Sequence, residues 1–137
     1  MEELIERLHA EGCSCVIANK EIRIFRQRGV ADLYYLLKHE ATFLKGAAIA
    51  DKVIGKAAAA LMVLGGIKTV YADVISQPAL TLLQKYHTDV SFAKVVPHII
   101  NRDRSGWCPL ETRTFQAETA EEILPIIEDF IQNNAKK

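Results

Sequence analysis

The chain has 137 residues, half of them hydrophobic, with seventeen basic and seventeen acidic side chains. This composition predicts one globular domain over residues 1–137 with a sizeable core. The balanced charge argues against a nucleic-acid-binding surface, and the lack of a long apolar run argues against a membrane-spanning helix. The acidic amphipathic start is unlike a signal peptide, and three cysteines fit a reducing cytoplasm better than a disulfide framework.

The first third of the chain predicts a helix, a hairpin and a second helix. The spacing of apolar residues favours helices at the two ends of this region, and alternation favours two short strands between them. Cys13 and Cys15 alternate on the first strand, so both are expected on one buried sheet face. A strand or an extended lead is expected over Phe43–Ile49. The other elements are expected at Glu2–Glu11, Cys13–Ala18, Glu21–Arg26 and Ala31–Glu40.

The stretch Ala47–Gly66 predicts the central helix of the fold. Asp51 is a favoured N-cap residue, and the alanine run Ala57–Ala60 has the highest helix propensity available. The pair Gly65-Gly66 supplies the left-handed turn that ends many helices. The sequence therefore predicts a buried helix that begins at Asp51.

Two lysines mark the expected start of this helix. Lys52 and Lys56 are four residues apart, so they share one face near the positive helix end, where an anion would offset their repulsion. Gly55 lies between them, where a glycine is expected if a backbone or ligand comes close. Two interpretations stay open: an anion-facing site, or a solvated lysine pair with a packing glycine.

The second half of the chain alternates strands and helices. This order, after a hairpin, predicts a three-layer α/β/α sandwich with helices on both faces of a mixed sheet. Ligands of such sheets lie beyond the carboxyl ends of strands. The elements are expected at Thr69–Asp73 (strand), Pro78–Tyr86 (helix), Val90–Val96 (strand), Ile99–Trp107 (polar loop), a helix opened by Cys108–Glu111, and Ala120–Gln132 (helix).

Cys108 occupies an expected helix N-cap, with Glu111 three residues later as in a capping box. A thiol at a helix start is stabilised as the thiolate, so Cys108 is a candidate nucleophile. Trp107 beside it is a candidate stacking residue for a planar ligand. The alternative is a small buried residue at an ordinary helix start, with Trp107 in the core. His98, at the end of a strand, is a further candidate for lining the same cleft.

The blocks D-K-V-I-G-K-A and C-P-x-E, with G-V-A-D-L before them, resemble a prokaryotic domain-of-unknown-function family with a cytidine-deaminase-like fold. The resemblance covers nearly the whole chain. It implies that Asp51, Lys52, Lys56, Cys108 and Glu111 lie within reach of one another at two helix starts. By analogy with the fold, it also implies a homo-oligomer.

Zinc deaminases carry H-x-E at one such helix start and P-C-x-x-C at the next. Here the two starts read Asp51-Lys52-Val53 and Cys108-Pro109-Leu110-Glu111, so neither a metal nor another cofactor is expected.

Three functions follow as hypotheses. The favoured one is a metal-independent domain that binds a small anionic or nucleotide-like metabolite through Lys52, Gly55, Lys56 and Trp107. The second is an enzyme with Cys108 as nucleophile, Lys52 assisting, and Asp51 or Glu111 moving the proton. The third is a structural or assembly partner. Neither a nucleic-acid nor a membrane partner is expected.

Overall fold

The structure is a computed structural model that describes residues 1–26, 30–99 and 109–135. Its centre is a mixed sheet in the order β2-β1-β3-β4-β5. β1 is antiparallel to β2 and to β3, whereas β3, β4 and β5 run parallel to one another. The strands are β1 (Cys15–Asn19), β2 (Glu21–Phe25), β3 (Ala48–Ile54), β4 (Thr69–Ser76) and β5 (Asp89–Val96).

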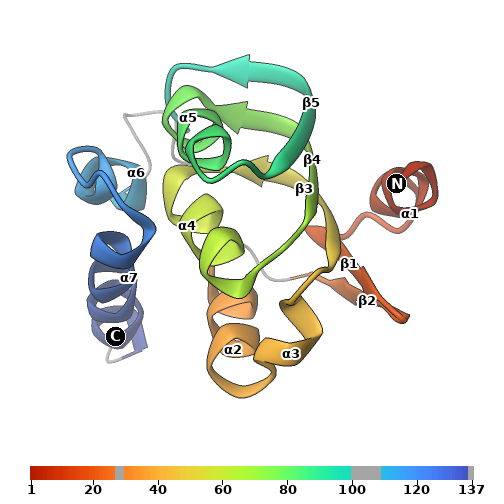
Figure 1. Cartoon of the computed structure of the whole chain (residues 1–137), viewed down its shortest axis with the longest axis horizontal. Coiled ribbons are helices and arrows are strands. Elements are labelled where there is room, and N and C mark those ends of the chain that lie inside the picture. The colour runs from red at the N-terminus through yellow and green to blue at the C-terminus, as the bar shows by residue number, and fades with distance from the viewer. Residues whose placement is uncertain (27–29, 100–108, 136–137) are drawn as a thin grey trace.

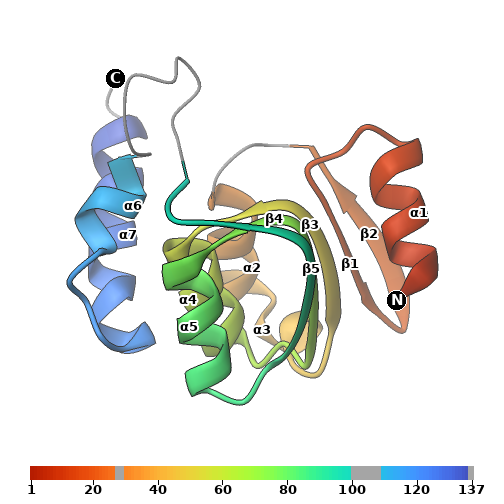
Figure 2. The ribbon, with the colours of Figure 1, turned by 90° about the horizontal axis from the view of Figure 1, so that it is seen from above.

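Helices cover both sides of this sheet, as the sequence predicts. α2, α4 and α5 lie on one side, and α1 lies alone on the other within the described chain (Figures 1 and 2). α6 and α7 pack against α4. The helices are α1 (Glu2–Ala10), α2 (Ala31–His39), α3 (Ala41–Leu44), α4 (Lys56–Gly65), α5 (Gln77–Lys85), α6 (Pro109–Thr114) and α7 (Ala120–Ala135). No described helix has the length and apolar character that a membrane crossing requires.

The main core fills the space between the sheet and α4. Every residue of α4 from Lys56 to Met62 is buried, which explains why small alanines are needed where α2, α5 and α7 approach this helix. Gly66 ends α4 in the left-handed conformation with φ 78°, as predicted.

The start of α4 differs from the prediction. Asp51 is not its N-cap: residues 48–54 form β3, and α4 begins at Lys56 with Gly55 as N-cap. The β-branched Val53 and Ile54 pair in register with Val74 and Ile75 of β4, so the strand continues past the expected helix start. Phe43, expected in a strand or extended lead, lies instead in the short helix α3.

A second, smaller core lies under α1. Leu4 and Leu8 of α1 pack there with Cys13, Val16 and Ala50. Cys13 precedes β1, whereas Cys15 lies in the main core on the other side of the sheet. The expectation that both cysteines share one face was therefore wrong, because the strand begins only at Cys15.

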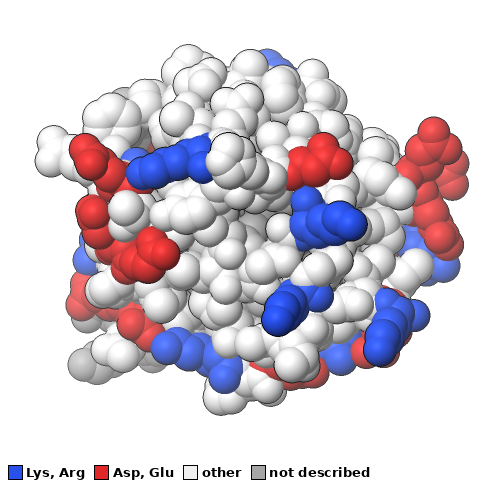
Figure 3. Space-filling model, viewed as in Figure 1, with Lys and Arg blue, Asp and Glu red and all other residues white. Residues whose placement is uncertain are grey.

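Acidic and basic side chains are interspersed on the face shown in Figure 3, with uncharged atoms between them.

Candidate functional site

The carboxyl ends of the parallel strands β3 and β4 lead directly into helix starts. Gly55 joins β3 to α4 in an extended conformation, with φ −97° and ψ 177°. Ser76 ends β4 and caps α5, since its hydroxyl accepts a hydrogen bond from the Ala79 N–H at 3.2 Å. This is the edge of a parallel sheet where ligands are bound in α/β folds.

Glu111 of α6 lies over the start of α4. Its Oε2 accepts a hydrogen bond from the backbone N–H of Lys56 at 3.0 Å, and the residue is only 3% exposed. The position satisfies one of the free amides of the first helical turn and lies at the positive end of the helix. A carboxylate is therefore already bound where the sequence predicts an anion.

Gly55 makes this approach possible. A Cβ atom at position 55 would lie 2.9 Å from Glu111 Oε2 and 3.3 Å from Ile99 Cγ1. The backbone conformation of Gly55 is open to any residue, so the glycine is required by space rather than by φ. The expectation of a close approach at Gly55 is met by a side chain of the same chain.

The side chain of Lys56 turns towards the end of α6. Its Nζ donates to the carbonyl oxygen of Phe115 at 2.9 Å and to that of Ala117. Burial lowers the pKa of Lys56, and the negative charge of Glu111 opposes this effect. We call the group Gly55, Lys56, Glu111, Phe115 and Ala117 the α4 clasp, because both ends of α6 are held by one residue of α4.

Asp51 and Lys52 lie on β3, before the α4 clasp. The Oδ1 of Asp51 accepts from the backbone N–H of Val53 at 3.3 Å, and its cross-strand partner is Cys15. Burial raises the pKa of Asp51 from 3.8 to about 7, and the nearby charge of Asp73 contributes to the rise. The backbone N–H of Lys52 donates to the carbonyl of Ser14 at 3.1 Å.

The structure thus brings together Gly55, Lys56 and Glu111. The predicted proximity of Asp51 and Lys52 to these residues is not seen in the hydrogen bonds of the described chain. Cys108 and Trp107 lie outside the described residues, so their roles stay predictions. His98 follows β5, and its ring meets Phe115 edge-on at a centroid distance of 5.5 Å.

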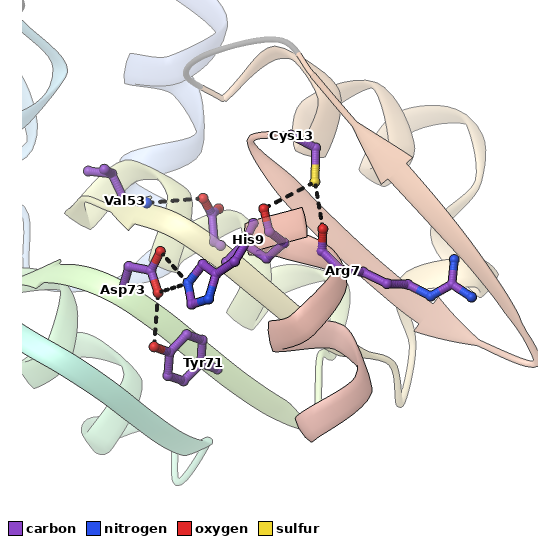
Figure 4. A network of polar contacts seen from close by, with 8 residues as sticks. Arg7, His9, Cys13, Val53, Tyr71 and Asp73 are labelled. Atoms are coloured by element: carbon purple, nitrogen blue, oxygen red, sulfur yellow. Dashed lines mark hydrogen bonds and ion pairs between the residues drawn. The ribbon is translucent and has the colours of Figure 1, made fainter. Parts of the chain in front are cut away.

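A second polar group, on the α1 side of the sheet, was not predicted. His9 Nε2 lies 2.8 and 3.0 Å from the two carboxylate oxygens of Asp73, and the Tyr71 hydroxyl donates to Asp73 at 2.9 Å (Figure 4). We call His9, Tyr71 and Asp73 the α1 tether. His9 and Asp73 are 64 positions apart, so no local pattern could have indicated their contact.

Among the described residues, no group of three or more His, Cys, Asp or Glu side chains is arranged to hold a metal ion. A hollow of about 400 Å³ lies at the β1–β2 turn and the α2–α3 junction. Its Arg23 is paired with Glu21 and Glu40 and lies 4.1 Å over the ring of Phe43. Because these charges satisfy one another, the hollow is a weaker candidate than the start of α4.

Comparison with known proteins supports the fold. A crystal structure of a DUF1893 family protein (TM1506) from Thermotoga maritima matches with a TM-score of 0.86 and 25% sequence identity. The match covers 93% of this chain and 87% of that one. The comparison with curated proteins found no match. The family model TM1506, domain of unknown function (DUF1893), matches residues 3–131, and the chain therefore belongs to this family.

Proposed function

We propose that this chain is a small-molecule-binding domain with a metal-independent, cytidine-deaminase-like fold. Its ligand, a nucleotide-like metabolite, lies at the start of α4. The arrangement of an antiparallel β1–β2 hairpin followed by parallel strands with connecting helices supports this fold. The carboxyl edge of β3 and β4 is the place where such a sheet binds ligands.

One observation carries the proposal. Glu111 is buried against the first turn of α4, and the lack of a side chain at Gly55 leaves the space that the carboxylate occupies. Taking a carboxylate out of water costs free energy unless both oxygens are hydrogen-bonded, and Oε1 of Glu111 has no hydrogen-bond partner in the described chain. The α4 clasp is thus better explained by recognition than by stability alone.

The residue types support a role without a resident metal. The start of α4 reads Gly55-Lys56-Ala57, and α6 begins Pro109-Leu110-Glu111, whereas zinc deaminases use H-x-E and P-C-x-x-C at such helix starts. Cys108, which immediately precedes α6 in the sequence, is the one residue at these two helix starts of the type that zinc prefers, and one thiolate beside a carboxylate is a poor zinc set by ligand preference.

A binding panel tests the proposal. Nucleosides, nucleotides, nucleobases and small organic anions are titrated by calorimetry into the wild type and into the Gly55→Ala variant. Gly55→Ala displaces Glu111, so at least one compound class is expected to bind the wild type about 10-fold more tightly. Glu6→Gln, which alters an exposed carboxylate of α1 on the other side of the sheet, is the matched control and should bind like the wild type. Binding that Gly55→Ala leaves unchanged, or no binding by any class, would refute a ligand site at α4.

A further inference from the structure

One carboxylate oxygen of Glu111 is buried without a partner. Oε2 is held by the Lys56 N–H, but Oε1 has no hydrogen-bond donor anywhere in the described chain. The whole residue is 3% exposed, so bulk water does not solvate this atom. Nearly all buried polar atoms in native proteins are hydrogen-bonded, so an exception of this kind needs a physical reason.

The missing partner of Oε1 is a donor. A glutamate carboxylate carries only hydrogen-bond acceptors, and this one lies at the positive end of α4. Because Oε2 already accepts from Lys56, an incoming group must give its hydrogen to Oε1. A ligand that offers only lone pairs, such as a phosphate or carboxylate oxygen, would be repelled.

The local charges also limit what the donor can be. Glu111 is the one acidic side chain of the α4 clasp, and the positive end of α4 and the Lys56 ammonium both act on it; Glu118 and Glu122 also attract this ammonium, and Lys85 repels it. A cationic donor would therefore meet a second positive charge in a poorly solvated place. An uncharged donor avoids both penalties.

Apolar and aromatic side chains around the α4 clasp favour a flat apolar body behind that donor. Ile99 lies beside the carboxylate over Gly55, and the Phe115 ring, 47% exposed, lies next to the ring of His98. Apolar and aromatic walls with one fixed polar group are typical of small-molecule sites.

We infer that the α4 clasp recognises an uncharged planar N–H group, of the kind carried by cyclic amides and nitrogen heterocycles, through Glu111 Oε1. This inference rests on the proposed function and names the part of the ligand that is recognised. The two lysines of the sequence predict an anion at this place, whereas this inference puts a hydrogen-bond donor there.

The experiment follows the backbone amide of Lys56 by NMR during titration, because this N–H bonds the same carboxylate. Uracil and 2-pyrrolidinone carry the N–H group, whereas 1,3-dimethyluracil and N-methylpyrrolidinone are matched compounds without it. Inorganic phosphate and methylammonium represent the anion and the cation. The N–H compounds are expected to shift the Lys56 amide and to bind at least 10-fold more tightly than their methylated counterparts. Uracil represents the nitrogen heterocycles and 2-pyrrolidinone the cyclic amides, so a difference between their affinities shows which kind of N–H group is preferred.

Glu111→Gln sharpens the test. Its carbonyl oxygen can keep the Lys56 hydrogen bond, which leaves an NH2 group in place of Oε1. Affinity for the N–H compounds should fall about 10- to 100-fold. Glu6→Gln, again an exposed control, should retain affinity. If Glu111→Gln fails to fold, Gly55→Ala moves the carboxylate without removing it and should give the same loss.

The outcomes separate the two proposals. Equal binding of methylated and unmethylated compounds, or undiminished binding by Glu111→Gln, overturns the N–H inference. Tight phosphate binding that Gly55→Ala weakens also overturns it but leaves the proposed function standing. If no compound of any class binds, both are overturned, and Oε1 is satisfied by a buried water alone.

Discussion

The α4 clasp and the α1 tether differ in how deeply their carboxylates are buried and in how completely these are hydrogen-bonded. In the α4 clasp, Glu111 is 3% exposed and one of its oxygens lacks a donor within the described chain. In the α1 tether, the side chain of Asp73 is 26% exposed and receives hydrogen bonds from two side chains, those of His9 and Tyr71 (Figure 4). The hydrogen bonding of the buried carboxylate is incomplete within the described chain, whereas both oxygens of the partly exposed carboxylate have a partner.

The difference indicates which group is built for a ligand. A partly exposed carboxylate that already has two donors gains little from a further partner, because water solvates the lone pairs that the protein leaves open. A buried carboxylate with an open oxygen gains a full hydrogen bond when a donor arrives. Recognition is therefore expected at the α4 clasp, and attachment of α1 is expected from the tether.

The largest effect is expected at Asp51 of β3, which lies on the strand next to Asp73 of the α1 tether. Its pKa is raised to about 7, so the folded protein holds the protonated form of Asp51 at pH values below about 7. As pH rises from about 4 to 7, the unfolded chain loses this proton first, and the free energy of unfolding should fall by about 2–4 kcal/mol. Asp51→Asn should lack most of that fall and should be the more stable protein at pH 8. Urea unfolding at several pH values measures both.

The exposed Asp89 of β5 supplies the control for Asp51. Asp89→Asn should keep the wild-type pH dependence. An Asp51→Asn variant with the same slope between pH 4 and 7 would show that Asp51 is not the group that causes this pH dependence.

The next effect concerns the space between Gly55 and Glu111. Gly55→Ala should lower the free energy of unfolding by about 1–2 kcal/mol, because the new methyl group displaces a hydrogen-bonded carboxylate. In a Glu111→Ala background the same substitution should lower it by only about 0.5–1 kcal/mol, the usual difference between Gly and Ala at an N-cap. A double-mutant cycle by urea unfolding isolates the coupling of about 1 kcal/mol. Additive effects would contradict the close contact.

The end of α4 could be predicted from sequence, but its start could not. Gly66 needs a left-handed conformation that few other residues adopt, so it marks the helix end by local chemistry. At the start, Asp51 has the chemistry of an N-cap, but the choice between strand and helix is made by pairing with β4. That pairing depends on residues 21 positions later, which local patterns do not reveal.

The same distinction holds for the site. Gly55 and Glu111 each stand out in the sequence as a glycine at a charged helix start and as an acid near a helix start. Their contact, and the turn of the Lys56 side chain towards Phe115 and Ala117, exist only because α6 folds back onto α4. An anion site was the natural prediction from two lysines, because the sequence alone does not show which charge reaches the helix first.

The smallest effect is expected at the α1 tether. His9→Gln keeps a side chain that can donate to Asp73 but removes the imidazole ring and one of its two close contacts with the carboxylate. Since the His9 side chain is 53% exposed, the free energy of unfolding should fall by at most about 1 kcal/mol. Leu4 and Leu8 still hold α1 on the sheet, so the loss should appear mainly as a few-fold faster hydrogen exchange of the α1 amides. Tyr71→Phe, which removes the other donor to Asp73, should act in the same direction. A loss of several kcal/mol in either variant would mean that the tether, although exposed, supports the whole fold, and the contrast with the α4 clasp would then fail.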